Sequence, residues 1–193
     1  MTIKGDYILF FGSDWPSNFA QSPITVYDDF WEPSLIESDN EQSWNNLITF
    51  KTAEAYYQSR KAVLAGDKYN YYKIALAKDP AETKKLSHLI KLDSKAWDRI
   101  RVKAMWDTLH LKFEQNPDLK EKLLDPSLDG KKFVEASPYD CFWGAGISEK
   151  VLAREIEETG DISWFNFNRD IPRAENMLGE LLGKARDQFK NSL

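Results

Sequence analysis

Helix start and stop signals recur along this chain, and they constrain its fold more than any other feature of the sequence. Thr52 is a typical N-cap, and the run that follows it ends at Gly66, a natural helix stop. Asp79 and Pro80 combine a cap with a first-turn proline, and Glu82 completes a capping box. A second helix is therefore predicted to start there, and the fold is expected to be mainly helical.

Three further helices are predicted from breakers and from the spacing of apolar residues. One is predicted to start at a Ser94 cap and to end near Asn116, and a shorter one runs from Asp118 to Leu124. The apolar residues of the segment 177–189 follow the 3, 4 and 7 spacing of an amphipathic helix. This last helix is expected to serve mostly as core.

Short apolar runs predict strands at residues 7–11, 24–27, 47–50 and 133–136. The acidic stretch at 28–46 separates two of these runs and is predicted to be an insertion. A chain of 193 residues without repeats or long linkers is expected to bury one core. We therefore expect a single compact domain over residues 1–193, mainly α with a few short β-strands.

Composition excludes several classes of function. A formal net charge of -5 argues against a broad surface that tracks nucleic-acid phosphates. Cys141 is the only cysteine, so no intrachain disulfide can form, and two histidines could not complete a zinc site without carboxylates. No apolar run approaches roughly 20 residues and no signal peptide is evident. We expect a cytoplasmic protein that uses no membrane, metal or cofactor.

Polar residues converge on one side of the helix predicted after Thr52. Glu54, Gln58 and Lys61 stand at positions i, i+4 and i+7, with Tyr57 close to the same side. By spacing alone, a solvated helix face is the more ordinary interpretation. A pocket wall is the alternative, and it needs support from other segments.

A second group lies in the segment from Glu135 to Gly146. Asp140, Trp143 and Gly144 offer a carboxylate, a flat ring and thin backbone, which are the components of a pocket wall. An ordinary turn, in which Asp140 caps a backbone amide and Trp143 fills core, is equally consistent with the pattern.

Weaker candidates lie elsewhere in the chain. Ser17, Asn18 and Phe19 occupy an early aromatic loop, and Asn176 and Gly179 stand at the start of the last helix. Each amide has an ordinary alternative as a turn residue or as an N-cap.

A nucleophilic cysteine is a further alternative, with little in its favour. Cys141 could pair with His88 or His110, but nothing near it in the sequence activates the thiol.

Taken together and in order, these segments resemble the NADAR superfamily and its YbiA-like N-glycosidases. The resemblance spans nearly the whole chain, and a colinear set of motifs is more specific than any one of them. The matching stretches are Phe11-Gly12, Ser17–Phe19, Thr52–Lys61, Asp79-Pro80, Trp97 with Val102 to Met105, Lys112–Pro117, Val134–Ser137, Asp140 with Trp143–Gly146, and Asn176–Gly179 with Leu181-Leu182 and Arg186.

The resemblance implies a mainly helical fold with a pocket for a phosphorylated or ADP-ribosylated nucleoside-like substrate. Members are associated with two substrate classes, riboflavin-pathway ribosylaminopyrimidine phosphates and ADP-ribosylated guanine. The substrate is then a small molecule, or the same group carried on nucleic acid, and no obligate protein partner is implied. The sequence departs from the family pattern at 28–46 and at 149–173, and these segments leave the identity of the base open.

Carried onto matching positions, the resemblance implies Glu54, Asp140 and Lys61 as catalytic residues. The two carboxylates would surround the ribose C1 atom, where an oxocarbenium-like charge develops, and their roles can be exchanged. Lys61 would hold a phosphate or sugar oxygen, or attack C1 as a neutral amine. The implied substrate-binding residues are Asn18, Phe19, Gln58, Trp97, Trp143, Gly144, Asn176 and Gly179.

Two functions of other classes compete with hydrolysis. A non-catalytic module that binds NAD or ADP-ribose would use the same aromatic pocket, but a carboxylate at the ribose does not favour an anionic ligand. In a purely helical scaffold the tryptophans would be core, and replacing Glu54 would change no ligand-dependent signal.

Overall fold

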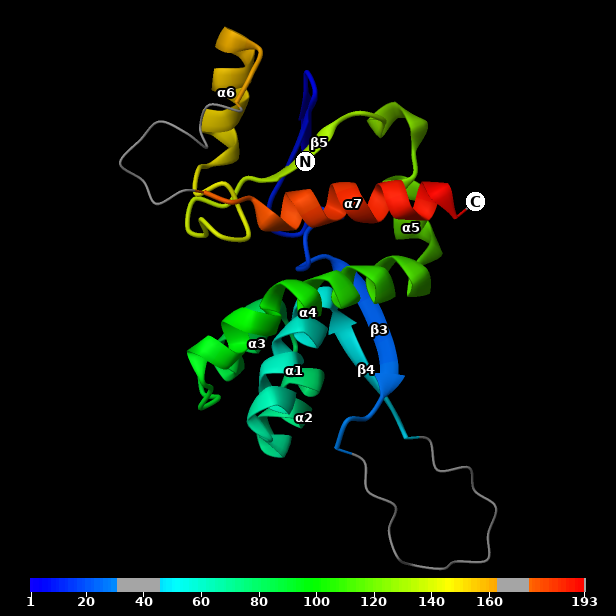
Figure 1. The fold of residues 1–193 in the computed structure, drawn as a ribbon, viewed down its shortest axis with the longest axis vertical. Coiled ribbons are helices and arrows are strands. Elements are labelled where there is room, and N and C mark those ends of the chain that lie inside the picture. The colour runs from blue at the N-terminus through cyan, green and yellow to red at the C-terminus, as the bar shows by residue number, and fades with distance from the viewer. Residues whose placement is uncertain (31–45, 163–173, 193) are drawn as a thin grey trace, which may run out of the picture.

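The computed structural model describes residues 1–30, 46–162 and 174–192. In these residues the chain forms seven α-helices and a few short strands, so the predicted fold class is confirmed (Figure 1). No helix among them is long and apolar enough to cross a membrane. Most of the insertion predicted at 28–46 lies outside the described residues.

The strands form two separate small sheets. β1 (Thr2–Lys4) pairs antiparallel with β2 (Tyr7–Phe10), and β2 pairs parallel with β5 (Lys132–Glu135). β3 (Gln21–Tyr27) and β4 (Leu47–Thr52) form an antiparallel pair. Four of these strands overlap the predicted apolar runs, whereas β1 was not predicted.

The helices begin and end largely where caps predict them. α1 (Ala53–Ala65) starts after Thr52, whose Oγ1 accepts from the Ala55 amide, and ends at Gly66 with a φ of 67°. α3 (Pro80–Ser87) follows Asp79, whose Oδ1 accepts from the Glu82 amide. The local hydrogen bonds expected from the sequence are therefore formed at both starts.

The remaining predicted helices are present with small shifts. They are α4 (Ser94–Gln115), α5 (Pro117–Leu123) and α7 (Met177–Asn191). The prediction that Ser94 caps α4 was wrong, because Asp93 is the N-cap and its Oδ1 accepts from the Lys95 amide.

Two helices and a 3-10 turn were not predicted. α2 (Lys68–Leu76) is rich in tyrosine, a residue of modest helix propensity, and it is held by burial of Tyr71 and Ile74. α6 (Glu149–Thr159) packs Leu152 and Ile156 against the three-stranded sheet. The 3-10 turn η1 (Pro126–Leu128) links α5 to β5. Tertiary packing, more than local signals, stabilises these elements.

Three clusters of buried side chains hold the elements together. The largest fills the space between α4, α7, β2 and β5, the second joins α1 and α2 to β3 and β4, and the third lies under α6. In Figure 1, α7 lies along one side of α4, and α1, α2 and α3 gather on its other side. α7 therefore packs against β5 of the three-stranded sheet, whereas α1 packs against the β3–β4 pair and the neighbouring helices.

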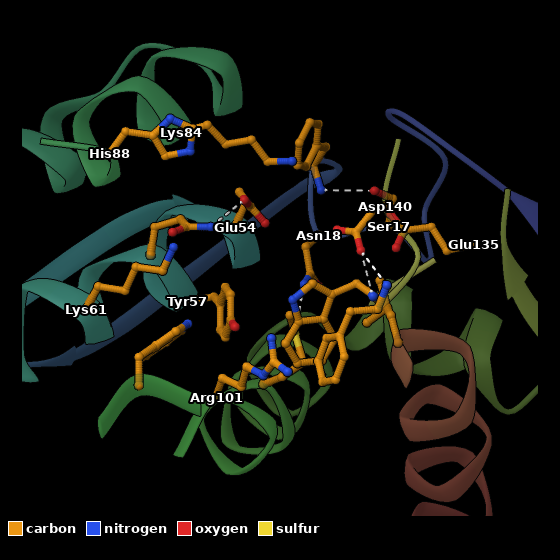
Figure 2. A pocket seen from close by; sticks show the side chains of 17 residues that line it. Ser17, Asn18, Glu54, Tyr57, Lys61, Lys84, His88, Arg101, Glu135 and Asp140 are labelled. Atoms are coloured by element: carbon orange, nitrogen blue, oxygen red, sulfur yellow. Dashed lines mark hydrogen bonds between the residues drawn. The ribbon is translucent and has the colours of Figure 1, made fainter. Parts of the chain in front are cut away.

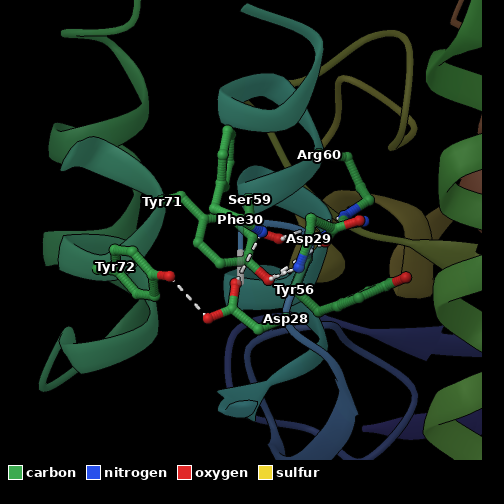
Figure 3. Close-up of polar contacts among 8 residues, drawn as sticks. All are labelled: Asp28, Asp29, Phe30, Tyr56, Ser59, Arg60, Tyr71 and Tyr72. Atoms are coloured by element: carbon green, nitrogen blue, oxygen red, sulfur yellow. Dashed lines mark hydrogen bonds and ion pairs between the residues drawn. The ribbon is translucent and has the colours of Figure 1, made fainter. Parts of the chain in front are cut away.

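A polar network fastens the described start of the acidic stretch to α1 and α2 (Figure 3). Asp29 forms an ion pair with Arg60 at 2.6 Å and accepts from the Tyr71 hydroxyl at 3.2 Å. Asp28 accepts from the Tyr72 hydroxyl at 2.7 Å. Asp28 and Asp29 are therefore held against α1 and α2.

Candidate active site

A pocket of about 440 Å³ opens between the first turns of α1, the helices α3 and α4, and the segment that follows β5. This volume is within the range of small-ligand sites. Figure 2 shows its side chains converging from these elements. They are Ser17, Asn18, Phe19, Glu54, Tyr57, Gln58, Lys61, Lys84, His88, Trp97, Arg101, Met105, Glu135, Asp140, Phe142, Trp143 and Leu178.

One wall is the polar side of α1. Glu54 and Gln58 are only 5% and 6% exposed, and Gln58 Nε2 donates to Glu54 Oε1 at 2.9 Å. The Glu54 amide donates to the carbonyl of Asn18 at 2.9 Å, which ties the helix start to the early loop. The solvated-face interpretation of this helix is wrong, because the α3 and α4 helices and the early loop enclose it.

The electrostatics of this wall are set by burial. Burial raises the pKa of the Glu54 carboxyl, while Lys84, the Gln58 amide and Lys61 act in the opposite direction. Burial also lowers the pKa of Lys61, and the charge of Glu54 opposes that change. A carboxyl and an amine with shifted pKa values therefore share one pocket, as is common at catalytic sites.

The opposite wall carries Asp140. Its Oδ1 accepts from the amides of Phe142 and Trp143 at 2.9 and 2.8 Å, so Oδ2 is the oxygen that can face a ligand. The Gly146 amide donates to the Asp140 carbonyl at 3.0 Å and closes the turn. Both interpretations of this segment hold at once, because Asp140 caps a turn and lines the pocket.

Glu135, at the end of β5, adds a third carboxyl that was not among the predicted site residues. Burial, Asp140 and Glu54 raise its pKa to about 7, against the effect of Lys84. Only its place just before Ala136 and Ser137 in a family-like motif pointed to it. Asp140 and Glu54 therefore lie close enough to Glu135 to disfavour its charged form.

Aromatic rings and cations surround the carboxyls. Tyr57 packs against Trp97 and Trp143, with centroids 5.3 and 5.5 Å away. Three cations each lie over a ring: Lys61 over Trp97 at 5.4 Å, Lys84 over Phe19 at 4.7 Å, and Arg101 over Phe142 at 3.5 Å. Carboxyls, flat rings and positive groups therefore share one cleft.

The early loop keeps its shape through a buried lysine of α4. Lys112 is fully buried, and its Nζ donates to the carbonyls of Trp15, Pro16 and Ser17 at 2.9, 3.0 and 2.9 Å. Asn18, next in the loop, donates from Nδ2 to the Met105 sulfur, and its Oδ1 has no partner among the described residues. A buried acceptor without a partner at a pocket wall is suited to a ligand donor.

Most of the predicted site residues meet in this pocket. Glu54, Asp140, Lys61, Asn18, Phe19, Gln58, Trp97 and Trp143 all line it. Gly144, Asn176 and Gly179, predicted to bind substrate, are not among the lining residues. Their atoms are engaged in packing around β5 instead.

Sequence reasoning missed several charged lining residues. Arg101 stands one helical turn after Trp97 on α4, and this i+4 spacing was a usable signal. Lys84 follows the predicted start of α3, but no local pattern marks it, and His88 was considered only as a partner of Cys141. Cys141 is half-buried and not among the lining residues, and no group of three metal-ligating side chains is found in the described part of the chain.

Fold and site together define a mainly helical protein with a polar, aromatic-walled pocket lined by carboxyls and cations. The chain belongs to the NADAR family, whose domain matches residues 13–190. The NMR structure of YbiA from E. coli has the same fold, with a TM-score of 0.63 at 21% identity over 99% of this chain and 89% of that one.

Two relatives by sequence are named N-glycosidase, and a third is named for riboflavin biosynthesis. A protein of Acanthamoeba polyphaga mimivirus named N-glycosidase is 27% identical over 94% of this chain and 95% of its own length. An N-glycosidase of Nostoc punctiforme is 28% identical over 92% of this chain and 86% of its own length. The riboflavin biosynthesis protein PYRR of Zea mays is 31% identical over 60% of this chain and 19% of its own length.

Proposed function

We propose that this protein is an N-glycosidase that hydrolyses the bond between a ribose and a base. Its substrate is a phosphorylated or ADP-ribosylated nucleoside-like molecule, either a riboflavin-pathway ribosylaminopyrimidine phosphate or an ADP-ribosylated guanine. The observation that carries the proposal is a buried carboxyl, Glu54, that shares an aromatic-walled, cation-rimmed pocket with Asp140. The names of two relatives support the type of bond, and the name of the maize relative supports the first substrate class.

The chemistry requires opposite charges to be stabilised within a few ångströms. Cleavage of the C1–N bond builds positive charge on the ribose and negative charge on the departing base. A carboxylate beside C1 stabilises the sugar, and an acid or strong donor assists the base. Glu54 and Asp140 reach the pocket from different elements, so a ribose bound between them would meet both.

In this proposal the rings bind the base of the ligand and the cations bind its phosphate oxygens. The pocket-lining rings of Trp97 and Trp143 would stack on the base, and Lys84 and Arg101 would supply positive charge for phosphate oxygens. A binding module for an anionic ligand would gain nothing from Glu54, which repels phosphate. The buried carboxyl therefore favours catalysis over recognition alone.

Lys61 has two candidate roles in this proposal. As an ammonium beside Glu54 it would hold a phosphate or sugar oxygen, and as a neutral amine it would attack C1 and form an imine. Burial lowers its pKa, which favours the amine, while Glu54 favours the ammonium. Borohydride added during turnover separates the roles, because only the imine leaves a covalent adduct.

The test of the function is release of a base. The protein is incubated with a ribosylaminopyrimidine phosphate and, separately, with ADP-ribosylated guanosine and ADP-ribosylated DNA, and free base or sugar phosphate is measured. Glu54→Gln and Asp140→Asn are expected to lower the rate by about 10²–10⁴-fold because each removes a charged group from the reacting centre.

Glu114→Gln on the exposed side of α4 is the matched control and is expected to keep the wild-type rate. If the wild-type protein binds these substrates without releasing base, the proposed enzyme is rejected in favour of a non-catalytic NAD- or ADP-ribose-binding module. Release that survives in Glu54→Gln would reject the proposed site.

A further inference from the structure

Three predicted substrate-binding residues, Gly144, Asn176 and Gly179, do not line the pocket. All three lie against the backbone of one short stretch of β5. Asn176 uses both ends of its side chain there: Oδ1 accepts from the Glu135 amide at 3.0 Å, and Nδ2 donates to the Phe133 carbonyl at 2.9 Å. To do this it adopts a φ of 44°, in the left-handed region that a residue with a side chain rarely enters. Its side chain bonds to the strand and makes no N-cap bond in α7.

Two glycines make room for this arrangement. A Cβ on Gly179 would lie 2.1 Å from the Phe133 carbonyl oxygen and 2.5 Å from the Asn176 Nδ2 atom. A Cβ on Gly144 would lie 2.9 Å from the Glu135 carbonyl oxygen, which accepts from the Ala145 amide at 2.8 Å. The backbone of Glu135 is therefore held on both sides, and its side chain enters the pocket next to Asp140 (Figure 2).

The three pocket carboxyls differ in what stabilises their charged forms. Glu54 accepts from Gln58 and stands in the first turn of α1, where the helix dipole favours an anion. Asp140 accepts from two backbone amides. In the described part of the chain, no hydrogen-bond donor reaches the carboxyl of Glu135. Of the charged groups around it, Asp140 and Glu54 disfavour its anion and Lys84 favours it.

Carboxyls that share one site do not all ionise together, and a proton resides where the anion is least stabilised. We infer that Glu135 is a further catalytic residue, the acid that protonates the departing base. The inference rests on the proposed N-glycosidase function and deepens it by dividing the roles among the carboxyls. Burial and then the like charges of Asp140 and Glu54 raise the pKa of Glu135 to about 7, which suits an acid that must hold a proton at neutral pH.

The C1–N bond breaks, its electron pair stays on the base nitrogen, and the proton of Glu135 moves to that base. Water then forms the new C1–O bond, and its released proton passes to the carboxylate of Asp140 or Glu54. Transfer of that proton to Glu135 restores the starting state, so one water is consumed for each base released.

The experiment compares wild-type protein, Glu135→Gln and the control Glu114→Gln on two leaving groups. One substrate carries the natural base. The other is the corresponding ribose 5-phosphate with a 4-nitrophenoxy group at C1, and this group departs as 4-nitrophenolate without being protonated. Glu135→Gln is expected to lower kcat about 10²–10⁴-fold on the base substrate. On the nitrophenyl substrate the loss is expected to be about tenfold or less, because general-acid assistance is not needed there.

A pH profile provides a readout that a structural role would not change. The wild-type kcat on the base substrate is expected to fall as pH rises above about 7, where Glu135 loses its proton, and Glu135→Gln is expected to lack this limb. Thermal unfolding of both variants checks that they fold.

Two negative results have different meanings. If the wild-type protein releases no base from any substrate, the proposed function fails. If the wild type is active but Glu135→Gln keeps the fall in kcat above about pH 7, the role of Glu135 as acid is overturned while the function stands. The same follows if Glu135→Gln loses activity equally on both substrates.

Discussion

The pocket has two walls, the α1 wall with Glu54 and the β5 wall with Glu135 and Asp140. The two walls position their carboxyls by different means. On the α1 wall, Glu54 depends mainly on residues close in sequence, since Thr52 caps its helix and Gln58 holds its carboxyl. On the β5 wall, Glu135 is held by Asn176, which lies 41 residues further along the chain. Asp140 is intermediate, because a local turn fixes its carboxyl while the packing of Gly144 places that turn.

The two walls are expected to differ in how well they tolerate substitutions. A wall built from one capped helix keeps its geometry if that helix forms, because its contacts are short-range. A wall built from a strand, a loop and a distant helix start needs all three to dock without gaps or clashes. The β5 wall should therefore be the more sensitive one, and the following variants test that expectation.

Gly179→Ala is expected to have the largest effect on stability. The added methyl group clashes with the Phe133 carbonyl and the Asn176 side chain, and overpacking of this kind costs about 3 kcal/mol. Chemical unfolding measures this loss.

Gly183→Ala, on the same helix with nothing within 4 Å of the new methyl, is the matched control. It is expected to raise stability by about 0.5–1 kcal/mol through higher helix propensity. Equal effects of the two alanines would show that the β5 wall is not tightly packed.

Lys112→Met tests the long-range tie behind the α1 wall, and its effect should depend on pH. Burial lowers the pKa of Lys112 to about 7 from an ordinary value of 10.5, so above pH 7 the unfolded state binds more protons. The stability of the wild type relative to Lys112→Met is therefore expected to rise by about 2 kcal/mol between pH 7 and 9. Unfolding curves of both proteins at several pH values give this difference.

A flat difference across that range would mean that the three carbonyls keep Lys112 charged. In that case the ammonium clamps the early loop at all these pH values, and the tie is stronger than burial alone implies.

Thr52→Ala is expected to have the smallest effect, because it removes one local cap from α1. Loss of the bond from the Ala55 amide costs about 1 kcal/mol, or about 3 °C in Tm. Thr52→Ser keeps the hydroxyl and should stay near the wild type. A loss as large as that of Gly179→Ala would contradict the contrast between the walls.

Much of the fold could be predicted from local signals. The caps at Thr52 and Asp79 and the apolar spacing of α7 located those helices because hydrogen bonds and side-chain periodicity act over a few residues. The helices α2 and α6 were missed because their stability comes from burial of Tyr71 and Leu152 against distant strands. No short window of sequence contains that information.

The pocket shows the same division. The sequence alone determined that Glu54, Gln58 and Lys61 share one side of a helix, because the α-helical repeat requires it. Only the tertiary structure decided that this side is buried, that Glu135 joins Asp140 there, and that Asn176, Gly144 and Gly179 support the strand end rather than line the pocket. Contacts of this kind depend on how distant segments pack, and packing is a property of the whole chain.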